Sequence, residues 1–294
     1  MKLLTCYTVA AALPLAEASA ATYFFTFGDS YTQTGFNVNG QQPSTSNPMG
    51  NPELGKDTTT GGINWPGYLT TVDNESLVLN YNFAVGGATT DNEIVLSNGP
   101  VKDLVGQVDD FHSAYGDKPS STPWSSDNAV FGIWMGINDI GRSLYFDRNA
   151  SASQVIPALT KQYESLVEEL YSDGGRKFLF LNIPATSRSP ETMSRGPEMV
   201  KKTAAWIKAY NTALGLMVRR LESEYEDIEI VLYDSWSFMN SILDEPEKHG
   251  FLNEICEAEN GESCVWWNQF HPGWKYHKLQ AADMKGFLED FGGW

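Results

Sequence analysis

Positive charge, cysteine and long apolar runs are scarce in this chain of 294 residues, and each scarcity excludes a class of protein. Lysine and arginine together number 20, against 37 aspartates and glutamates, so the formal net charge is −17. A surface this acidic repels phosphate backbones and anionic lipids, so we expect no nucleic-acid partner and no membrane partner. The acidity suits neutral substrates in an acidic medium, or it serves solubility alone.

The few cysteines and histidines have no spacing typical of a zinc site, so we expect neither a metal nor a cofactor. Beyond the N-terminus, no segment is long and apolar enough to span a bilayer.

Residues 1–20 have the pattern of a secretory signal peptide. Lys2 supplies the positive start, residues 9–13 supply an apolar core, and Ala18-Ser19-Ala20 has the small-residue form of a cleavage site. A buried N-terminal helix is the alternative. The pattern predicts cleavage before Ala21, a mature domain of residues 21–294, and a secreted, extracellular protein.

Secretion determines how the cysteines and the glycan acceptor motifs are interpreted. Cys6 is lost with the signal, which leaves Cys256 and Cys264 to form a disulfide in an oxidising compartment, with two free thiols as the alternative. The disulfide would stiffen the segment that precedes the last histidine block. Asn74 and Asn149 each begin an Asn-x-Ser triplet, so we expect both to carry N-linked glycans on surface loops.

Apolar runs and helical patterns alternate along the mature chain. Strands are predicted near 23–28, 77–83, 129–134, 177–182 and 228–233, and helices near 101–115, 153–173, 198–225 and 274–291. This alternation predicts one α/β domain in which helices cover both faces of a mostly parallel five-stranded sheet. Residues 35–66 form a long irregular stretch, which we expect to be one wall of a pocket.

A Gly28-Asp29-Ser30 turn directly follows the first predicted strand. In open α/β sheets the chemistry lies at the carboxyl ends of strands, so Ser30 is a candidate nucleophile, with an ordinary turn as the alternative. Three further blocks follow in order: residues 82–88 with the pair Gly86-Gly87, residues 136–139 with Asn138, and the dipeptide His271-Pro272. A nucleophile, oxyanion donors and a base are the parts that acyl transfer needs.

These four blocks, in this order, resemble those of GDSL-type esterases of the SGNH hydrolase superfamily. Within it, the chain resembles the fungal extracellular acetylesterases of the sixteenth carbohydrate-esterase family. The resemblance covers nearly all of residues 21–294 and implies a three-layer α/β/α, flavodoxin-like fold. It implies that Ser30 is the nucleophile and His271 the base. It also implies an oxyanion hole formed by the backbone N–H groups of Ser30 and Gly87, or Gly86 as the alternative, and by the Asn138 amide.

One position departs from the family pattern. The family usually has an aspartate three residues before the histidine, whereas this chain has Asn268. An asparagine can accept a hydrogen bond from the imidazole but carries no charge, and its NH₂ group, if turned toward the ring, favours the wrong tautomer. We therefore expect a slowed Ser30–His271 dyad that Asn268 orients.

Several other residues near these blocks are expected to have structural roles. We expect Asp29 and Asp139 to brace their turns, and His277 to lie on an exposed helix face beside Lys275 and Lys278. His112 and His249 are expected to be solvated. Four tryptophans lie near the site blocks in sequence, and a sugar can stack on an aromatic face, so we predict substrate contacts for Trp65 and Trp266; packing in the core is the alternative.

The sequence thus predicts a monomeric, secreted serine esterase that removes short acyl groups, most of all acetyl, from plant cell-wall oligosaccharides. The acetyl preference comes from the resemblance. A lipase, phospholipase or thioesterase on the same scaffold is one alternative. A catalytically weakened carbohydrate-binding relative is the other, and Asn268 alone motivates it.

Overall fold

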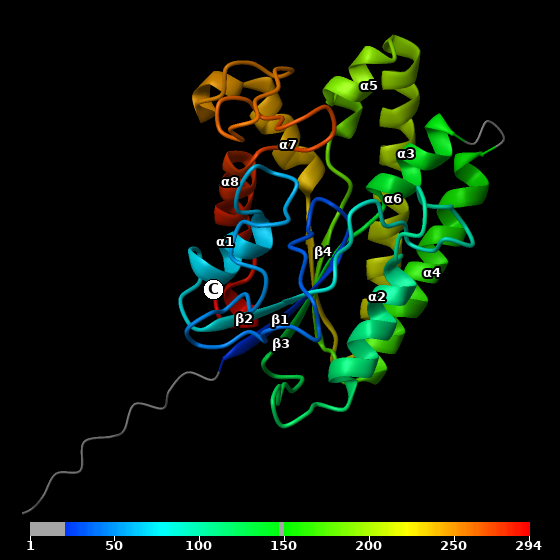
Figure 1. The fold of residues 1–294 in the computed structure, drawn as a ribbon. Coiled ribbons are helices and arrows are strands. Elements are labelled where there is room, and N and C mark those ends of the chain that lie inside the picture. Colours follow the sequence, from blue (N-terminus) through cyan, green and yellow to red (C-terminus); the bar gives the residue numbers. More distant parts are fainter. Residues whose placement is uncertain (1–20, 147–149) are drawn as a thin grey trace, which may run out of the picture.

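The computed structural model describes residues 21–146 and 150–294 (Figure 1). The predicted signal peptide and the glycan acceptor Asn149 lie outside these described residues. No helix in the described part of the chain combines the length and the apolar character needed to cross a membrane.

A five-stranded sheet forms the centre of the molecule. Its strands are β1 (Thr22–Gly28), β2 (Val78–Asn82), β3 (Ala129–Trp134), β4 (Lys177–Leu181) and β5 (Glu229–Tyr233). They lie in the order β2-β1-β3-β4-β5, and every neighbouring pair is parallel. Strands buried on both faces are expected to be continuously apolar, and β1 is buried along its whole length. The predicted strands and the flavodoxin-like strand order are confirmed.

Helices cover both faces of this sheet (Figure 1). One layer contains α2 (Leu104–Phe111), α4 (Ala152–Ser172) and α6 (Pro197–Glu224), and the opposite layer contains α1 (Trp65–Thr71) and α8 (Trp274–Lys285). Shorter helices lie beyond the carboxyl ends of the strands: α3 (Ile137–Tyr145), α5 (Pro190–Ser194) and α7 (Ser235–Asp244). The three-layer α/β/α architecture is therefore confirmed.

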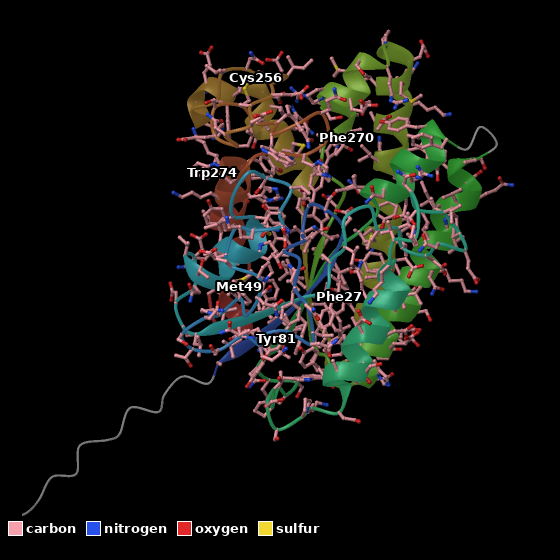
Figure 2. All side chains as sticks on the ribbon, in the orientation of Figure 1. Phe27, Met49, Tyr81, Cys256, Phe270 and Trp274 are labelled. Atoms are coloured by element: carbon pink, nitrogen blue, oxygen red, sulfur yellow. A yellow bond between two sulfur atoms is a disulfide. The ribbon has the colours of Figure 1, made fainter. Side chains whose placement is uncertain are left out.

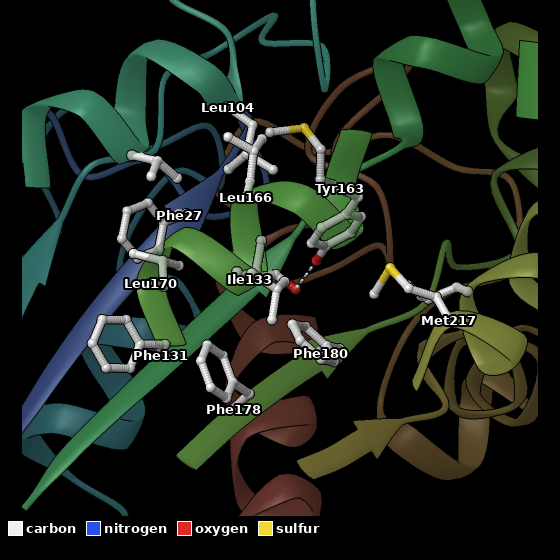
Figure 3. Close-up of a cluster of buried hydrophobic side chains, with 14 of the residues drawn as sticks. Phe27, Leu104, Phe131, Ile133, Tyr163, Leu166, Leu170, Phe178, Phe180 and Met217 are labelled. Carbon is white, nitrogen blue, oxygen red and sulfur yellow. Dashed lines mark hydrogen bonds between the residues drawn. The ribbon is translucent and has the colours of Figure 1, made fainter. Parts of the chain in front are cut away.

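The largest of three buried hydrophobic clusters in the described residues lies between the sheet and the layer that contains α4 and α6. Figure 3 shows Phe131, Phe178 and Phe180 of the strands beneath Tyr163 and Leu166 of α4. The Tyr163 hydroxyl donates to the Ile133 carbonyl, which keeps this buried polar group paired. Helix α6 contributes its Trp206, Tyr210, Leu214 and Met217 side chains to the same core.

The predicted helices differ from the observed ones mainly at their ends. The segment 101–115 becomes α2 followed by a π-helical turn, His112–Gly116, and the segment 274–291 becomes α8 followed by a short 3₁₀ turn, Glu289–Phe291. The short helices α1, α3, α5 and α7 were not predicted, because each spans ten residues or fewer, which is shorter than the window over which helical periodicity can be recognised.

The strand order determines where a site can form. The chain leaves β1 for β2 on one side and returns to β3 on the other, so β1 and β3 flank the point at which the winding reverses. Ligands in open parallel sheets bind at this point, outside the carboxyl ends of the strands. Ser30 lies two residues beyond β1, and Asn138 lies four residues beyond β3.

Candidate active site

The Ser30 turn begins where β1 ends at Gly28. This glycine has φ +150°, and a Cβ atom added to it would lie 2.6 Å from the Trp134 carbonyl oxygen on the neighbouring strand. Only glycine therefore allows the chain to turn so close to β3. Beyond it, Asp29 is fully buried and its Oδ1 accepts the backbone N–H of Tyr31 at 2.9 Å, which braces the turn around Ser30.

A buried glutamine of α2 anchors the same glycine from the other layer. Gln107 Oε1 accepts the Gly28 N–H at 2.9 Å, and Gln107 Nε2 donates to the Gly28 carbonyl at 2.8 Å. Gln107 is 0% exposed and is the acceptor of the buried Gly28 N–H, whereas the Gly28 carbonyl also accepts the backbone N–H of Val85 at 3.1 Å.

We expect the Gln107→Leu variant to lose stability. The substitution leaves the Gly28 N–H buried and unpaired, while its carbonyl keeps the Val85 N–H, so the expected cost is about 1–3 kcal/mol. Urea unfolding curves of the variant and parent measure this difference. Gln154→Leu, on the exposed surface of α4, serves as the control and should change stability by less than about 0.5 kcal/mol. Equal midpoints for the parent and Gln107→Leu would contradict the anchoring role.

His271 lies beside the Ser30 hydroxyl although the two residues are 241 positions apart in sequence. Ser30 Oγ and His271 Nε2 are 2.8 Å apart, and His271 Nδ1 lies 3.0 Å from Asn268 Oδ1. The loop after Trp267 carries the histidine, and Phe270 at its tip is visible near the carboxyl edge in Figure 2. The fold thus brings the three predicted residues into one hydrogen-bonded chain.

Two backbone groups determine which end of the Asn268 amide faces the imidazole. The N–H groups of Phe270 and His271 both donate to Asn268 Oδ1, at 2.9 Å each. Only an oxygen can accept them, so the carbonyl end of the amide faces His271 and the NH₂ end faces away. The imidazole must then carry its proton on Nδ1, which leaves Nε2 to accept the Ser30 hydroxyl proton.

Burial lowers the pKa of His271 to about 4, because the enclosed site stabilises a charged imidazolium poorly. A carboxylate at position 268 would oppose this shift, and Asn268 does not. The ring is therefore neutral above about pH 4, and a neutral ring is the form that can accept a proton.

The Gly86-Gly87 pair forms a turn beside Ser30. Gly86 N–H donates to Gln33 Oε1, whereas the N–H groups of Ser30 and Gly87 have no acceptor in the described part of the chain. Gly87 has φ +83°, a conformation that favours glycine. Of the two alternatives, the geometry therefore favours Gly87 as the oxyanion donor, since its N–H is free.

Asn138 lies in the first turn of α3, just past the end of β3. Its Nδ2 donates to the Ala88 carbonyl at 2.9 Å and makes a longer contact of 3.3 Å with Asp29 Oδ2. The neighbouring Asp139 is buried and accepts the backbone N–H of Thr90 at 3.0 Å. Burial raises the pKa of both Asp29 and Asp139 to about 7.

A cavity of about 450 Å³ opens beside Ser30 and His271. Gly87 and Asn138 line it at the catalytic end, and Ile137 and Ile140 of α3 contribute apolar surface. Phe146 and Phe270 lie at its walls with 65% and 48% of their surfaces exposed. Hydroxyl-bearing residues form another part of the wall: Thr186, Ser189, Thr192 and Thr203.

The prediction that Trp65 and Trp266 contact substrate is wrong. Both side chains are 0% exposed and neither lines the cavity. Trp65 packs edge-on against Phe24 and donates its indole N–H to Thr32 Oγ1, and Trp266 donates its indole N–H to the Glu254 carbonyl. Each ring belongs to a core, so no indole face is available to a sugar.

Two further expectations are corrected. His277 is 0% exposed, because it shares the buried face of α8 with Gln280, Ala281 and Met284 at helical spacing. Burial lowers its pKa to about 3. Residues 35–66 do not line the cavity; instead, this stretch supports the serine turn from behind, where Thr59 Oγ1 donates to the Ser30 carbonyl at 2.7 Å.

Cys256 and Cys264 form a disulfide with Cα atoms 5.5 Å apart. The loop they close is joined to the histidine segment by the Ala258 N–H, which donates to the Trp266 carbonyl. Asn74, the described glycan acceptor, lies in a half-buried turn where its Nδ2 donates to the Ser76 carbonyl at 2.7 Å.

Several residues at the site were not singled out from the sequence. Gln33 and Gln107 hold the two turns, and the Tyr31 hydroxyl donates to the Phe270 carbonyl and so ties the serine turn to the histidine loop. Tyr31 directly follows the Gly-Asp-Ser block, which is a signal that could have been used. No sequence signal identifies the glutamines, because their partners are backbone groups distant in the chain.

Comparisons with known proteins find relatives along most of the chain. Residues 24–284 match the family described as GDSL-like Lipase/Acylhydrolase. An acetylesterase from Thermothelomyces thermophilus is 38% identical over 275 residues, which cover 92% of this chain and 90% of that protein. An acetylesterase from Hypocrea jecorina is 22% identical, over 85% of this chain and 84% of its own length.

Solved structures extend the comparison to the fold. Axe2, an acetylxylan esterase from Geobacillus stearothermophilus, aligns with a TM-score of 0.51 at 14% identity, over 94% of this chain and 96% of its own. At this identity the likeness concerns the fold alone. On the extent of the family match and the identity to a close relative, the chain belongs to the GDSL-like lipase/acylhydrolase family of carboxylic ester hydrolases.

Proposed function

We propose that this ester hydrolase is a secreted serine acetylesterase in which Ser30 is the nucleophile, His271 the general base and Asn268 the group that orients the base. The observation that carries the proposal is the 2.8 Å distance between Ser30 Oγ and His271 Nε2. The other nitrogen of the same imidazole, Nδ1, is hydrogen-bonded to Asn268. The groups in place are those that acyl transfer requires, and the chemistry needs neither a metal nor a cofactor.

The reaction proceeds in two halves. Ser30 Oγ attacks the ester carbonyl carbon while His271 Nε2 takes the hydroxyl proton, and the negative charge develops on the carbonyl oxygen. That oxyanion is stabilised by the backbone N–H groups of Ser30 and Gly87. It is also stabilised by the side-chain N–H of Asn138 that makes the longer, 3.3 Å contact with Asp29. His271 then gives its proton to the leaving alcohol. In the second half a water molecule, deprotonated by His271, attacks the acetyl-serine and releases acetate.

The proposed natural substrates are acetylated oligosaccharides of the plant cell wall. Two relatives carry the name acetylesterase, and the acidic surface suits a neutral sugar in an acidic medium. The cavity of about 450 Å³ is far larger than an acetyl group, so it has room for part of a sugar leaving group. The signal-like sequence pattern of residues 1–20 supports the proposal of secretion, and we propose a monomer.

An acyl-chain series tests the acetyl preference. We expect kcat/KM for 4-nitrophenyl esters to be highest for acetate and to fall more than tenfold beyond butyrate, because each added methylene requires apolar surface that the cavity shares with the leaving group. A parallel assay with acetylated xylo-oligosaccharides measures acetate release. Equal or rising values through octanoate would contradict the proposal.

Hydrolysis of longer acyl esters is the second candidate function. Phe146 and Phe270 are exposed at the cavity wall, and the exposed Leu96 lies beside Arg142, whose Nε donates to the Leu96 carbonyl. These side chains would give an apolar chain a surface to lie on. A maximum of kcat/KM at octanoate or beyond in the same series would support this candidate.

A further inference from the structure

A second groove lies at the same edge of the sheet as Ser30, beyond the carboxyl ends of β4 and β5. Its volume is about 750 Å³. Asn182 directly follows β4 and Asp234 directly follows β5, and both side chains line it together with Lys208 of α6 and Trp236 of α7. In Figure 1, α6 and α7 lie on either side of the upper end of β4.

The groove and the catalytic cavity share two walls. In the turn after β4, Thr186 and Ser189 line the catalytic cavity, whereas Ser187 and Arg188 between them line the groove. In α6, Thr203 likewise faces the cavity and Lys208 the groove. One turn and one helix, about 10 Å across, therefore separate the two sites.

Trp236 is unlike the buried tryptophans of this protein. It is 43% exposed, whereas Trp65, Trp124, Trp134 and Trp266 are at most 2% exposed. Its backbone is held on both sides, because its N–H donates to Asn182 Oδ1 at 2.9 Å and its carbonyl accepts Asn240 Nδ2 at 2.9 Å. An aromatic ring presented from a fixed backbone loses little entropy when a ligand covers it.

Polar groups of both signs surround this indole. Asp234 is held by Asn182 Nδ2 at 2.8 Å and by the Ser237 hydroxyl at 2.5 Å. Burial alone would raise the pKa of Asp234, but these hydrogen bonds outweigh it and lower the pKa, so the side chain is an ionised acceptor. The Trp236 indole N–H and Lys208 Nζ are donors without a partner in the described part of the chain.

We propose that this groove binds a neutral oligosaccharide, with the face of Trp236 stacked on a sugar ring and Asp234 and Lys208 bonded to its hydroxyls. An apolar ring face beside both donors and acceptors fits a polyol, whose C–H groups and hydroxyls alternate. An acyl chain would leave the polar groups unpaired, and an anion would meet Asp234. The proposal rests on the proposed function in one respect: the oligosaccharide that binds in the groove would also present its acetyl ester to Ser30.

Binding of unacetylated xylohexaose, measured by calorimetry on the full chain, tests the groove without any hydrolysis. We expect Trp236→Ala to weaken the binding at least tenfold, about 1.4 kcal/mol, and Trp236→Tyr to retain most of it, because a tyrosine still offers a ring face. The matched control is Phe287→Ala, an exposed aromatic at 57% that does not line the groove, and it should bind as the parent does. Absence of binding by the parent, or equal affinities for parent and Trp236→Ala, would overturn the proposal.

Kinetics provide the second readout. Trp236→Ala should lower kcat/KM for acetylated xylohexaose five- to tenfold and leave 4-nitrophenyl acetate hydrolysis unchanged, since that ester is too short to reach the groove. The two proposals fail separately. Xylohexaose binding without release of acetate from its acetylated form supports the groove and contradicts the sugar-ester function. Acetate release that is the same in Trp236→Ala as in the parent supports the sugar-ester function and contradicts the groove.

Discussion

The Ser30→Ala variant is expected to lose about 10⁵- to 10⁶-fold in kcat for 4-nitrophenyl acetate, the scale measured when a serine nucleophile is removed from a comparable site. Without Oγ no acyl-enzyme can form. The N–H groups of Ser30 and Gly87 remain, so a small residual rate from oxyanion stabilisation should persist. Initial rates at pH 8, with the rate of uncatalysed hydrolysis subtracted, measure the effect.

Controls separate a lost nucleophile from a damaged fold. Ser153→Ala, at an exposed position of α4, should turn over as the parent does. His271→Ala should be nearly as slow as Ser30→Ala, and the double variant no slower than either, because the two side chains act as one unit. A fluorophosphonate should label the parent at Ser30 and leave Ser30→Ala unlabelled. A Ser30→Ala protein with a tenth of the parent rate would mean that another group attacks the ester.

The parts of this site that could be predicted from the sequence are those in which a short segment determines its own geometry. A glycine-containing turn after a buried strand must raise the next side chains above the sheet edge. Ser30 follows such a turn and lies at that edge. The strand order then places Asn138 beside it, because β3 pairs with β1. A histidine near the C-terminus could be chosen as the base because its block follows the order of the family.

The tryptophans were mispredicted because closeness in sequence does not determine which way a side chain faces. Trp65 begins α1, and α1 packs against the sheet, so its ring turns inward to Phe24 and Trp134. Trp236, which does lie at a groove, has no catalytic motif beside it in sequence. The hydrophobic pattern of α7 does not mark Trp236 as a residue that lines a groove either.

His277 was misplaced for a related reason. The lysines on either side of it suggested a solvated face, but in a helix adjacent residues point about 100° apart, and residues three or four apart share a face. Gln280, Ala281 and Met284 are the neighbours that determine its environment. Counting residues at that spacing would have indicated burial.

The Asn268→Asp variant is expected to turn over 4-nitrophenyl acetate about 10- to 100-fold faster than the parent at pH 8. A carboxylate at this position stabilises the imidazolium that forms during attack, and each tenfold gain is about 1.4 kcal/mol of barrier. The gain should stay below the roughly 10⁴-fold loss known for the converse change in the serine-protease template, where the asparagine also imposes the wrong tautomer. Here two backbone N–H groups already turn the amide oxygen to His271, so charge alone is missing.

Asn268→Ala is the matched comparison. It removes the acceptor of Nδ1–H together with the partner of two backbone donors, so both the tautomer and the ring orientation are released. We expect a fall of at least tenfold in kcat. If Asn268→Asp leaves turnover unchanged at every pH, the site is not handicapped by its missing charge.

The same substitution should move the pH profile, and the direction follows from the protonation state that the base needs. His271 works as a neutral ring, and its pKa is about 4 in the parent, so activity should fall only as the pH drops through about 4. An aspartate 3 Å away favours the charged ring and raises that pKa by about 1–3 units. Asn268→Asp should therefore lose activity below about pH 5–7 while the parent retains it, and the two curves of kcat/KM against pH should cross. With an asparagine at this position, the rate near neutral pH is lower, but His271 stays deprotonated in an acidic medium. Parallel curves with the same acid limb would contradict this account.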